Sequence, residues 1–332
     1  MNFIIKVVNL LIMFDDLDNI HPQKPEIKPL AKKDLAKKNL MVFLLMLTVL
    51  LFLMQDSTLL ISSMFGVIFI HEIGHFIGMK LFKFKDNKIF YFPLLSSFVK
   101  QKDNTISQKK HLTTLLFGPI PGIIIGTILL NQYFIAPTDL LLEISILFLA
   151  INMFSLLPLD PFDGGKILQS LFFPTNQTIK MYFVLFSSIV LIFVGFNYDL
   201  PILMIFGFLM GFKVRSIQKF DNIYTELDEQ EINYKKTYAS LTNREYWKIR
   251  SIFLDNNPKI KEMIADTDML WENEKLITDQ VNQILRIEMT KDASILFKLI
   301  VIVAVGLAIY FPINLFFEQQ DFFLNMIENA QI

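Results

Sequence analysis

Two histidines and a glutamate lie close together in the stretch FIHEIGHFIG (69–78), which is otherwise apolar. On a helix, His71 and His75 are one turn apart and share a face, so their rings can bind one metal ion. Glu72 lies beside His71, where its carboxylate can reach a water molecule on that ion. This spacing is typical of zinc hydrolases, in which the histidines are ligands and the glutamate is the general base. The motif therefore predicts a metal site with hydrolytic chemistry.

Most chance occurrences of this motif lie on helix faces in contact with water. The apolar surroundings of the motif in this chain favour metal binding instead. A charged group within a membrane span costs about 2.5–3.5 kcal/mol on insertion scales. Polar groups in such a span therefore need a partner, and a divalent cation can satisfy both rings at once.

A catalytic zinc ion also needs a third protein ligand and an open position for water. The candidates for this third ligand inside the predicted spans are the carboxylates of Asp139, Glu143, Asp160 and Asp163. Asp139 and Glu143 fall near the outer end of their span, whereas Asp160 and Asp163 fall near the depth of the two histidines. Asp163 precedes two glycines and a helical run, which favours it as the ligand. Asp160 precedes Pro161, which biases it towards an extended conformation and favours a role in a cap or turn.

Prolines 158 and 161 remove backbone donors and interrupt the helix that would carry these aspartates. Irregular backbone is tolerated inside a bilayer only where protein or a water-filled cavity satisfies its polar groups. The sequence therefore predicts a wet pocket at the metal.

The composition of the 332-residue chain is that of a membrane protein. The chain is 53% hydrophobic and only 19% charged, with a mean hydropathy of +0.46. The absence of cysteine excludes disulfides, thiol catalysis and thiolate metal ligands. A net charge of −1 gives no general attraction to nucleic acid, so no nucleic-acid partner is expected.

Apolar runs predict an all-α polytopic membrane protein with about seven transmembrane helices. The runs are 39–55, 57–82, 111–136, a segment that starts at 139 and is interrupted at 157–165, then 178–196, 199–213 and 294–317. Lysine and arginine in the flanks place the N-terminus, the loop 83–110 and the stretch 214–293 in the cytoplasm. The expected domains are a cytoplasmic N-terminal segment (1–38), a membrane domain (39–213) with its catalytic core at 57–175, a helical cytoplasmic domain (214–293), a last span (294–317) and an external tail (318–332).

Three segments outside the core have their own expected structures. The segment 1–16 is interpreted as an interfacial amphipathic helix. Residues 88–100 form either a re-entrant strand that pairs with substrate or an interfacial loop. The stretch 214–293 is expected to form amphipathic helices, with a capping box at Thr242–Glu245, and to serve either in gating and substrate docking or as a small helical cap.

Three motifs together resemble the site-2 protease family of intramembrane zinc metalloproteases, also known as peptidase family M50. They are HEIGH (71–75), FGPIPG (117–122) and INMFSLLPLDPFDGG (151–165). The resemblance covers about 57–175 and implies a three-helix catalytic core with one Zn²⁺ ion. It implies that His71, His75 and Asp163 bind the zinc and that Glu72 is the catalytic acid and base.

The resemblance also makes Asn152 the motif asparagine, expected to hydrogen-bond substrate or the developing oxyanion. The alternative is a polar contact between helices. Ser155 and Gly122 stand where many relatives have asparagine, and Phe162 stands where leucine is usual. These departures concern the positioning of substrate and leave the ligand set intact.

The predicted function is that of an intramembrane zinc metalloprotease, which hydrolyses peptide bonds in or next to transmembrane segments of other membrane proteins. Its expected partners are a transmembrane protein substrate and the lipid bilayer, and the sequence predicts no particular oligomeric state. The alternatives are a non-proteolytic scaffold that binds membrane proteins and an intramembrane metal transporter. The composition favours a bacterial plasma membrane, with the N-terminus in the cytoplasm.

Overall fold

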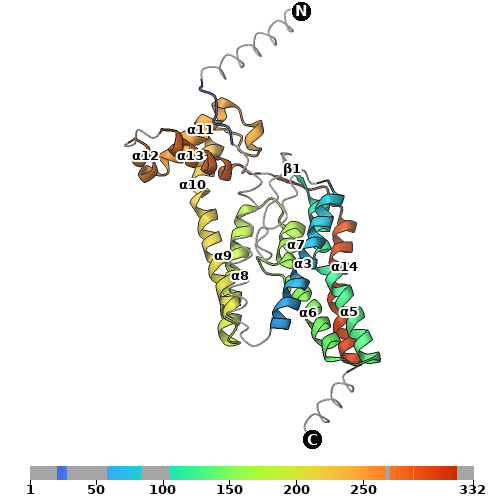
Figure 1. Ribbon diagram of the computed structural model, residues 1–332. Helices are drawn as coiled ribbons and strands as arrows, with labels where there is room; N and C mark the ends of the chain where they lie inside the picture. Colours follow the sequence, from blue (N-terminus) through green and yellow to red (C-terminus); the bar gives the residue numbers. More distant parts are fainter. Residues whose placement is uncertain (1–20, 28–57, 84–104, 266–269, 287, 320–332) are drawn as a thin grey trace, which may run out of the picture. The chain divides into compact units, whose positions relative to one another are not determined.

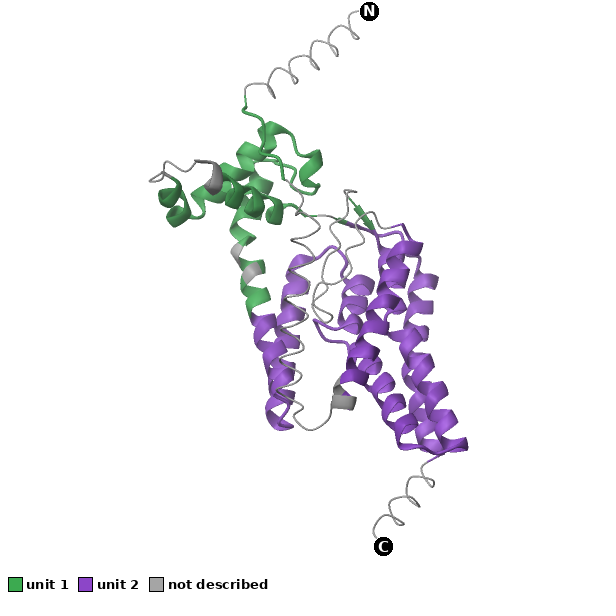
Figure 2. Ribbon diagram, viewed as in Figure 1, with its two compact units in different colours: residues 1–31, 101–106, 212–288 green, residues 32–100, 107–211, 289–332 purple. Residues whose placement is uncertain are grey.

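The computed structural model describes residues 21–27, 58–83, 105–265, 270–286 and 288–319. The chain divides into two compact units, shown in different colours in Figure 2. Unit 1 comprises 1–31, 101–106 and 212–288, and unit 2 comprises 32–100, 107–211 and 289–332. The predicted interfacial helix, the predicted span 39–55 and the segment 88–100 lie outside the described residues.

Unit 2 consists mainly of helices, and α4, α5 and α6 all contact α3. Helices α5 and α6 form a hairpin joined by residues 136–138, and α3 packs against α4, α5 and α6, while α14 packs against the same three helices (Figure 1). The helices are α3 (Thr58–Leu81), α4 (Gln108–Phe117), α5 (Pro119–Ile135), α6 (Asp139–Ser155), α7 (Asp163–Phe172), α8 (Gln177–Asn197), α9 (Pro201–Lys219), which continues into unit 1, and α14 (Ile295–Glu318).

Four stretches of helix in the described part of the chain are long and apolar enough to cross a membrane: 62–81, 108–135, 177–197 and 295–318. This agrees with a membrane protein that is mostly helical, but the predicted count of seven is not confirmed. Helix α6 has only 17 residues. Helix α9 ends in a basic segment that contains Lys213 and Arg215.

The predicted span 111–136 matches the candidate span 108–135, in which a one-residue break at Gly118 separates α4 from α5. Pro119 and Pro121 lack the backbone donors that would extend α4 through this point. Helix α3 lies against the break, because a Cβ on Gly74 would be 2.0 Å from the carbonyl oxygen of Phe117. The glycine and the break together allow the backbone of α3 to approach this junction closely.

The interrupted span has the predicted form: α6 ends at Ser155, a turn follows, and α7 begins at Asp163. The two glycines after Asp163 are required by this turn. A Cβ on Gly164 would lie 2.0 Å from the Leu156 carbonyl oxygen, and one on Gly165 would lie 2.3 Å from the Leu159 carbonyl oxygen. The start of α7 is thus folded back tightly onto the chain that leads into it.

Unit 1 contains α10 (Asp221–Glu229), the 3₁₀ helix η1 (Tyr238–Ser240), α11 (Asn243–Asp255), α12 (Pro258–Ala265) and α13 (Leu270–Ile284). Its core is apolar, and its fully buried members include Tyr246, Ile249 and Val281. The capping box predicted at the start of α11 is confirmed, because Thr242 and Glu245 each bond the other's backbone N–H.

A pair of short strands, β1 (Thr105–Ser107) and β2 (Glu288–Thr290), is a small departure from the expected all-α chain. Both strands contain threonine, and β1 also contains isoleucine, and these β-branched residues favour extended backbone.

Candidate metal centre

Three side chains from two helices of unit 2 converge at one buried point. His71 and His75 come from the middle of α3, and Asp163 is the first residue of α7. The Nε2 atoms of the two rings are 3.1 Å apart, and each is 3.1 Å from Asp163 Oδ2. The structure therefore brings together the three residues predicted as metal ligands. Among the described residues, they form a group of histidine and carboxylate side chains that could hold a metal ion.

Hydrogen bonds on the far side of each ring fix which nitrogen faces this point. His75 Nδ1 donates to the carbonyl oxygen of Thr114 at 2.9 Å, and His71 Nδ1 donates to Asn152 Oδ1 at 2.8 Å. The amide of Asn152 is itself oriented, because its Nδ2 donates to the carbonyl oxygen of Phe148. Both partners of the rings are acceptors, so in neutral rings the Nδ1 atoms carry the protons and the Nε2 atoms present lone pairs.

The three atoms that face one another, two imidazole nitrogens and a carboxylate oxygen, are all acceptors. No donor of the described residues lies between them, and a bound cation would satisfy all three. Zinc bonds of about 2.0–2.1 Å at tetrahedral angles hold ligand atoms roughly 3.3–3.4 Å apart. The three distances of 3.1 Å are close to this spacing. Two nitrogens and one carboxylate oxygen are also ligands that zinc commonly accepts. The residues therefore fit a zinc ion with three protein ligands.

Two glycines of the GPIPG motif allow this packing. A Cβ on Gly118 would lie 2.3 Å from His75 Nε2, and one on Gly122 would lie 2.2 Å from Asn152 Nδ2. Neither distance is possible for real atoms, so a side chain at either position would displace a ligand or the group that orients it. The break between α4 and α5 thus serves the metal site as well as the fold.

Glu72, predicted as the general base, lies next to His71 on α3. Its Oε1 atom is buried and has no hydrogen-bond partner among the residues that the structure describes. A buried carboxylate oxygen without a partner is costly unless a ligand or water satisfies it. Such an atom beside a ligand histidine is what an acid or base that acts on bound water requires.

Asn152 is completely buried and bonds His71. This contact makes it a group that orients a ligand ring. Its expected contact with substrate or an oxyanion stays a prediction.

The other acidic residues of the predicted spans lie outside the group. Asp160 is buried in the turn before α7, where its Oδ2 accepts a hydrogen bond from Gln169 and its backbone N–H donates to Ser187 Oγ. This placement agrees with the structural role expected from the sequence. Asp139 is exposed at the start of α6, and Glu143 is partly exposed one turn later.

Lys166 is a member of the site that the sequence reasoning missed. Its Nζ lies 3.3 Å from Asp163 Oδ1, so the two oxygens of the carboxylate face different partners. The lysine neutralises one oxygen and leaves Oδ2 for the metal. Its position one turn after Asp163, on the same face of α7, was the available signal.

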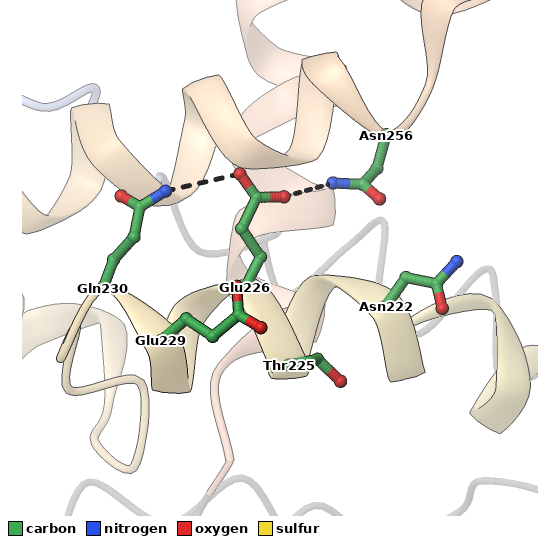
Figure 3. A pocket seen from close by; sticks show the side chains of 6 residues that line it. All are labelled: Asn222, Thr225, Glu226, Glu229, Gln230 and Asn256. Carbon is green, nitrogen blue, oxygen red and sulfur yellow. Dashed lines mark hydrogen bonds between the residues drawn. The ribbon is translucent and has the colours of Figure 1, made fainter.

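A second polar site lies in unit 1 and has a different character. Figure 3 shows its six side chains, with Glu226 bonded to Gln230 at 3.3 Å and to Asn256 at 2.9 Å. These bonds use both oxygens of Glu226, and the lining contains no histidine. The residues that form it are Asn222, Thr225, Glu226, Glu229, Gln230 and Asn256.

Comparison with known proteins finds a distant similarity to a zinc metalloprotease of Methanocaldococcus jannaschii. The two chains are 26% identical over 233 residues, which cover 67% of this chain and 66% of that protein. The match thus spans just under two thirds of the relative's length. No family model matches the chain, and no solved structure matches it. The chain is therefore a distant homologue of a zinc metalloprotease, and its His71–His75–Asp163 group could bind a metal ion.

Proposed function

We propose that the chain is an intramembrane zinc metalloprotease of the site-2 protease family, which cleaves transmembrane segments of other membrane proteins. The observation that carries the proposal is the convergence of three buried ligand atoms at 3.1 Å, with both histidine protons turned away. The distant similarity to a zinc metalloprotease supports the hydrolytic part. The apolar helices around the site support the membrane part.

We propose a role for each residue of the site, with support from their arrangement. His71, His75 and Asp163 would hold one zinc ion, which would supply Lewis acidity towards water and the scissile carbonyl. Glu72 accepts the proton of the attacking water and delivers it to the leaving amine. Asn152 and the Thr114 carbonyl hold the two rings in the orientation that exposes Nε2. The backbone carbonyls of a substrate helix are occupied by the hydrogen bonds of that helix. The helix must therefore unwind locally before a carbonyl can reach these groups.

The same proposal places the protein in a bacterial plasma membrane. The lysines and arginines that flank the apolar runs support a cytoplasmic location for the N-terminus and for 214–293.

The test is the variant Glu72→Gln in the full chain. We expect the variant to keep one zinc per chain, measured by elemental mass spectrometry, because Glu72 is not a ligand. We expect it to lose cleavage, measured as new peptide termini inside transmembrane segments in the membrane proteome of expressing cells. Glu143→Gln, a carboxylate on α6 outside the group, is the matched control and should behave like the parent chain.

Three outcomes would contradict the proposal. Cleavage by the Glu72→Gln variant would refute the role of this residue. A parent chain that holds zinc but produces no new termini would favour the scaffold. Zinc flux in vesicles that contain the parent chain would favour the transporter.

A further inference from the structure

The segment His21–Ile27 of unit 1 has the sequence HPQKPEI and belongs to no helix or strand. The rings of Pro22 and Pro25 lock their own φ angles, and each proline biases the preceding residue, His21 or Lys24, towards extended backbone. The segment therefore loses little conformational freedom when it is held in one place. Such a stretch is well suited to be recognised as a peptide.

Three side chains of η1 and α11 bind the backbone of this segment. The indole Nε1 of Trp247 donates to the Pro22 carbonyl oxygen at 2.6 Å, and the Tyr238 hydroxyl donates to the Pro25 carbonyl oxygen at 2.6 Å. Between these two contacts, the backbone N–H of Lys24 donates to Asn243 Oδ1 at 3.0 Å. The polar groups at both ends and in the middle of Pro22–Pro25 are thus bound by side chains that are distant in the sequence.

The side chain of Lys24 is bound as closely as the backbone. Its ammonium group donates to the carbonyl oxygens of Tyr238, at 2.8 Å, and Leu241. The same group lies 5.1 Å from the centre of the Tyr238 ring. These carbonyls belong to the first residue of η1 and to its C-cap residue, and each oxygen carries a partial negative charge that favours a cation. The site therefore binds the lysine that lies between the two prolines.

The aromatic residues of this site are held by the core of unit 1. The Tyr246 ring is fully buried and packs edge-on against both Tyr238, at 6.0 Å, and Trp247, at 5.3 Å. Arg250 lies over the Trp247 ring at 5.0 Å and is fixed by hydrogen bonds of 2.7 and 2.9 Å to Glu274. The hydrogen-bond donors are consequently positioned before any peptide binds.

We propose that Tyr238, Leu241, Asn243 and Trp247 form a recognition site for an extended Pro-x-Lys-Pro peptide, which the chain's own residues 22–25 occupy. We name these four residues the docking site. Aromatic donors to carbonyl oxygens, with pockets for flanking prolines, are how proteins bind polyproline-type segments. The contact ties the N-terminal segment to unit 1. This inference does not depend on the hydrolase, because no residue of the metal centre takes part.

A segment tethered to its site has an effective concentration in the millimolar range. The parent chain should therefore bind an added peptide of the same sequence only weakly. Loss of the tethered contact should open the site to that peptide.

The test uses the full chain in detergent and a fluorescein-labelled peptide, IHPQKPEIK, which corresponds to 20–28. Fluorescence anisotropy measures its binding to the parent, to Lys24→Met and to Gln23→Met. Lys24→Met removes the ammonium that binds the η1 carbonyls, whereas Gln23 is exposed and its variant is the matched control. We expect Lys24→Met to bind the peptide at least about tenfold more tightly than the parent or Gln23→Met.

A second variant tests the docking site directly. Trp247→Phe, added to Lys24→Met, keeps an aromatic ring but removes the indole N–H, and should weaken peptide binding by about tenfold. Far-UV circular dichroism verifies that each variant keeps the helix content of the parent. Equal peptide affinity of the parent and Lys24→Met would overturn the proposal, as would an absence of binding to Lys24→Met at millimolar peptide.

Discussion

Exposed apolar side chains are frequent in unit 2 and rare in unit 1. Among the described residues, only Phe212, Met263 and Leu276 are large exposed hydrophobic residues in unit 1, whereas α3, α8 and α14 of unit 2 each carry several. Buried polar side chains are distributed in the same way. Thr278 is the single buried polar residue of unit 1 in the described part of the chain, and all the others belong to unit 2.

The difference teaches which solvent each unit is built for. Unit 1 follows the pattern of a protein in water, with an apolar core and charged residues outside. Unit 2 exposes apolar surface, as a helix bundle in lipid does, and keeps its polar groups inside where they pair with each other. The metal centre is part of this inversion, because His71, His75 and Asp163 are buried in the unit whose outer surface is apolar.

The largest effect should come from the carboxylate of the metal centre. Asp163→Asn replaces a charged ligand oxygen with a neutral amide, so we expect the zinc affinity to fall by more than the roughly 10–100-fold that changes beyond the ligands cause. Asp160→Asn is the matched control, since an amide oxygen can still accept the hydrogen bond from Gln169. Zinc content after dialysis against a chelator measures both. Equal retention of zinc would remove Asp163 from the ligand set.

The sequence predicted the three side chains that converge at this site better than it predicted their surroundings. The HExxH spacing identified His71 and His75. Depth favoured Asp160 and Asp163 over Asp139 and Glu143, and the two glycines and helical run after Asp163 favoured it over Asp160. The sequence did not predict the groups that orient the two rings. His75 is held by a backbone carbonyl, that of Thr114, and every residue type has such a carbonyl.

The fold was predictable to a similar extent. Long apolar runs gave α3, α8 and α14, because length and hydropathy alone identify a span. The break at Gly118 follows locally from Pro119 and Pro121, but the close approach of α3 to it was missed, because that is a contact between segments distant in the sequence. The contact between residues 22–25 and α11 was missed for the same reason.

The second prediction tests whether exposed side chains of unit 2 contact lipid while exposed side chains of unit 1 contact water. Phe186, near the centre of α8, and Leu276, on α13, are both 59% exposed. Phe186→Lys places a charge on a surface that faces lipid, so we expect insertion or stability to fall by about 2.5–3.5 kcal/mol. Leu276→Lys should change stability by less than about 0.5 kcal/mol, as surface substitutions in water do.

The amount of detergent-extracted folded protein and its thermal unfolding measure this pair. If both variants were tolerated equally, α8 would not be in contact with lipid. The comparison between the units would then lose its physical basis.

The third prediction concerns the close approach of α3 to the helix break. Gly118→Ala would place a methyl carbon only 2.3 Å from His75 Nε2, so the ring must move. We expect zinc affinity to fall about 10–100-fold, as for other changes next to a ligand. Gly66→Ala is the control on α3, because a Cβ there meets nothing within 4 Å. Competition with a zinc chelator measures both, and an unchanged affinity in Gly118→Ala would mean that the ring is free to shift.

The smallest effect should come from unit 1, where a charge lies at the surface. Burial raises the pKa of Glu245, but hydrogen bonds from Lys236 and from the Thr242 backbone outweigh it and hold the pKa below its usual value of 4.5. Stabilisation from a depressed carboxylate pKa is present above about 4.5 and is lost as the pH falls through the folded-state value. Glutamine can keep the capping box, so Glu245→Gln removes only the charge that pairs with Lys236 and should destabilise unit 1 at pH 7 by about 0.2–1 kcal/mol.

The destabilisation by Glu245→Gln should shrink as the pH falls below 4.5, because the parent carboxylate then becomes protonated as well. Both tryptophans of the chain, Trp247 and Trp271, lie in unit 1, so their fluorescence in urea reports the unfolding of this unit within the full chain. Glu262→Gln, an exposed position on α12, is the control. A loss of stability that is the same at pH 7 and pH 4 would show that the packing of the side chain matters here, and its charge does not.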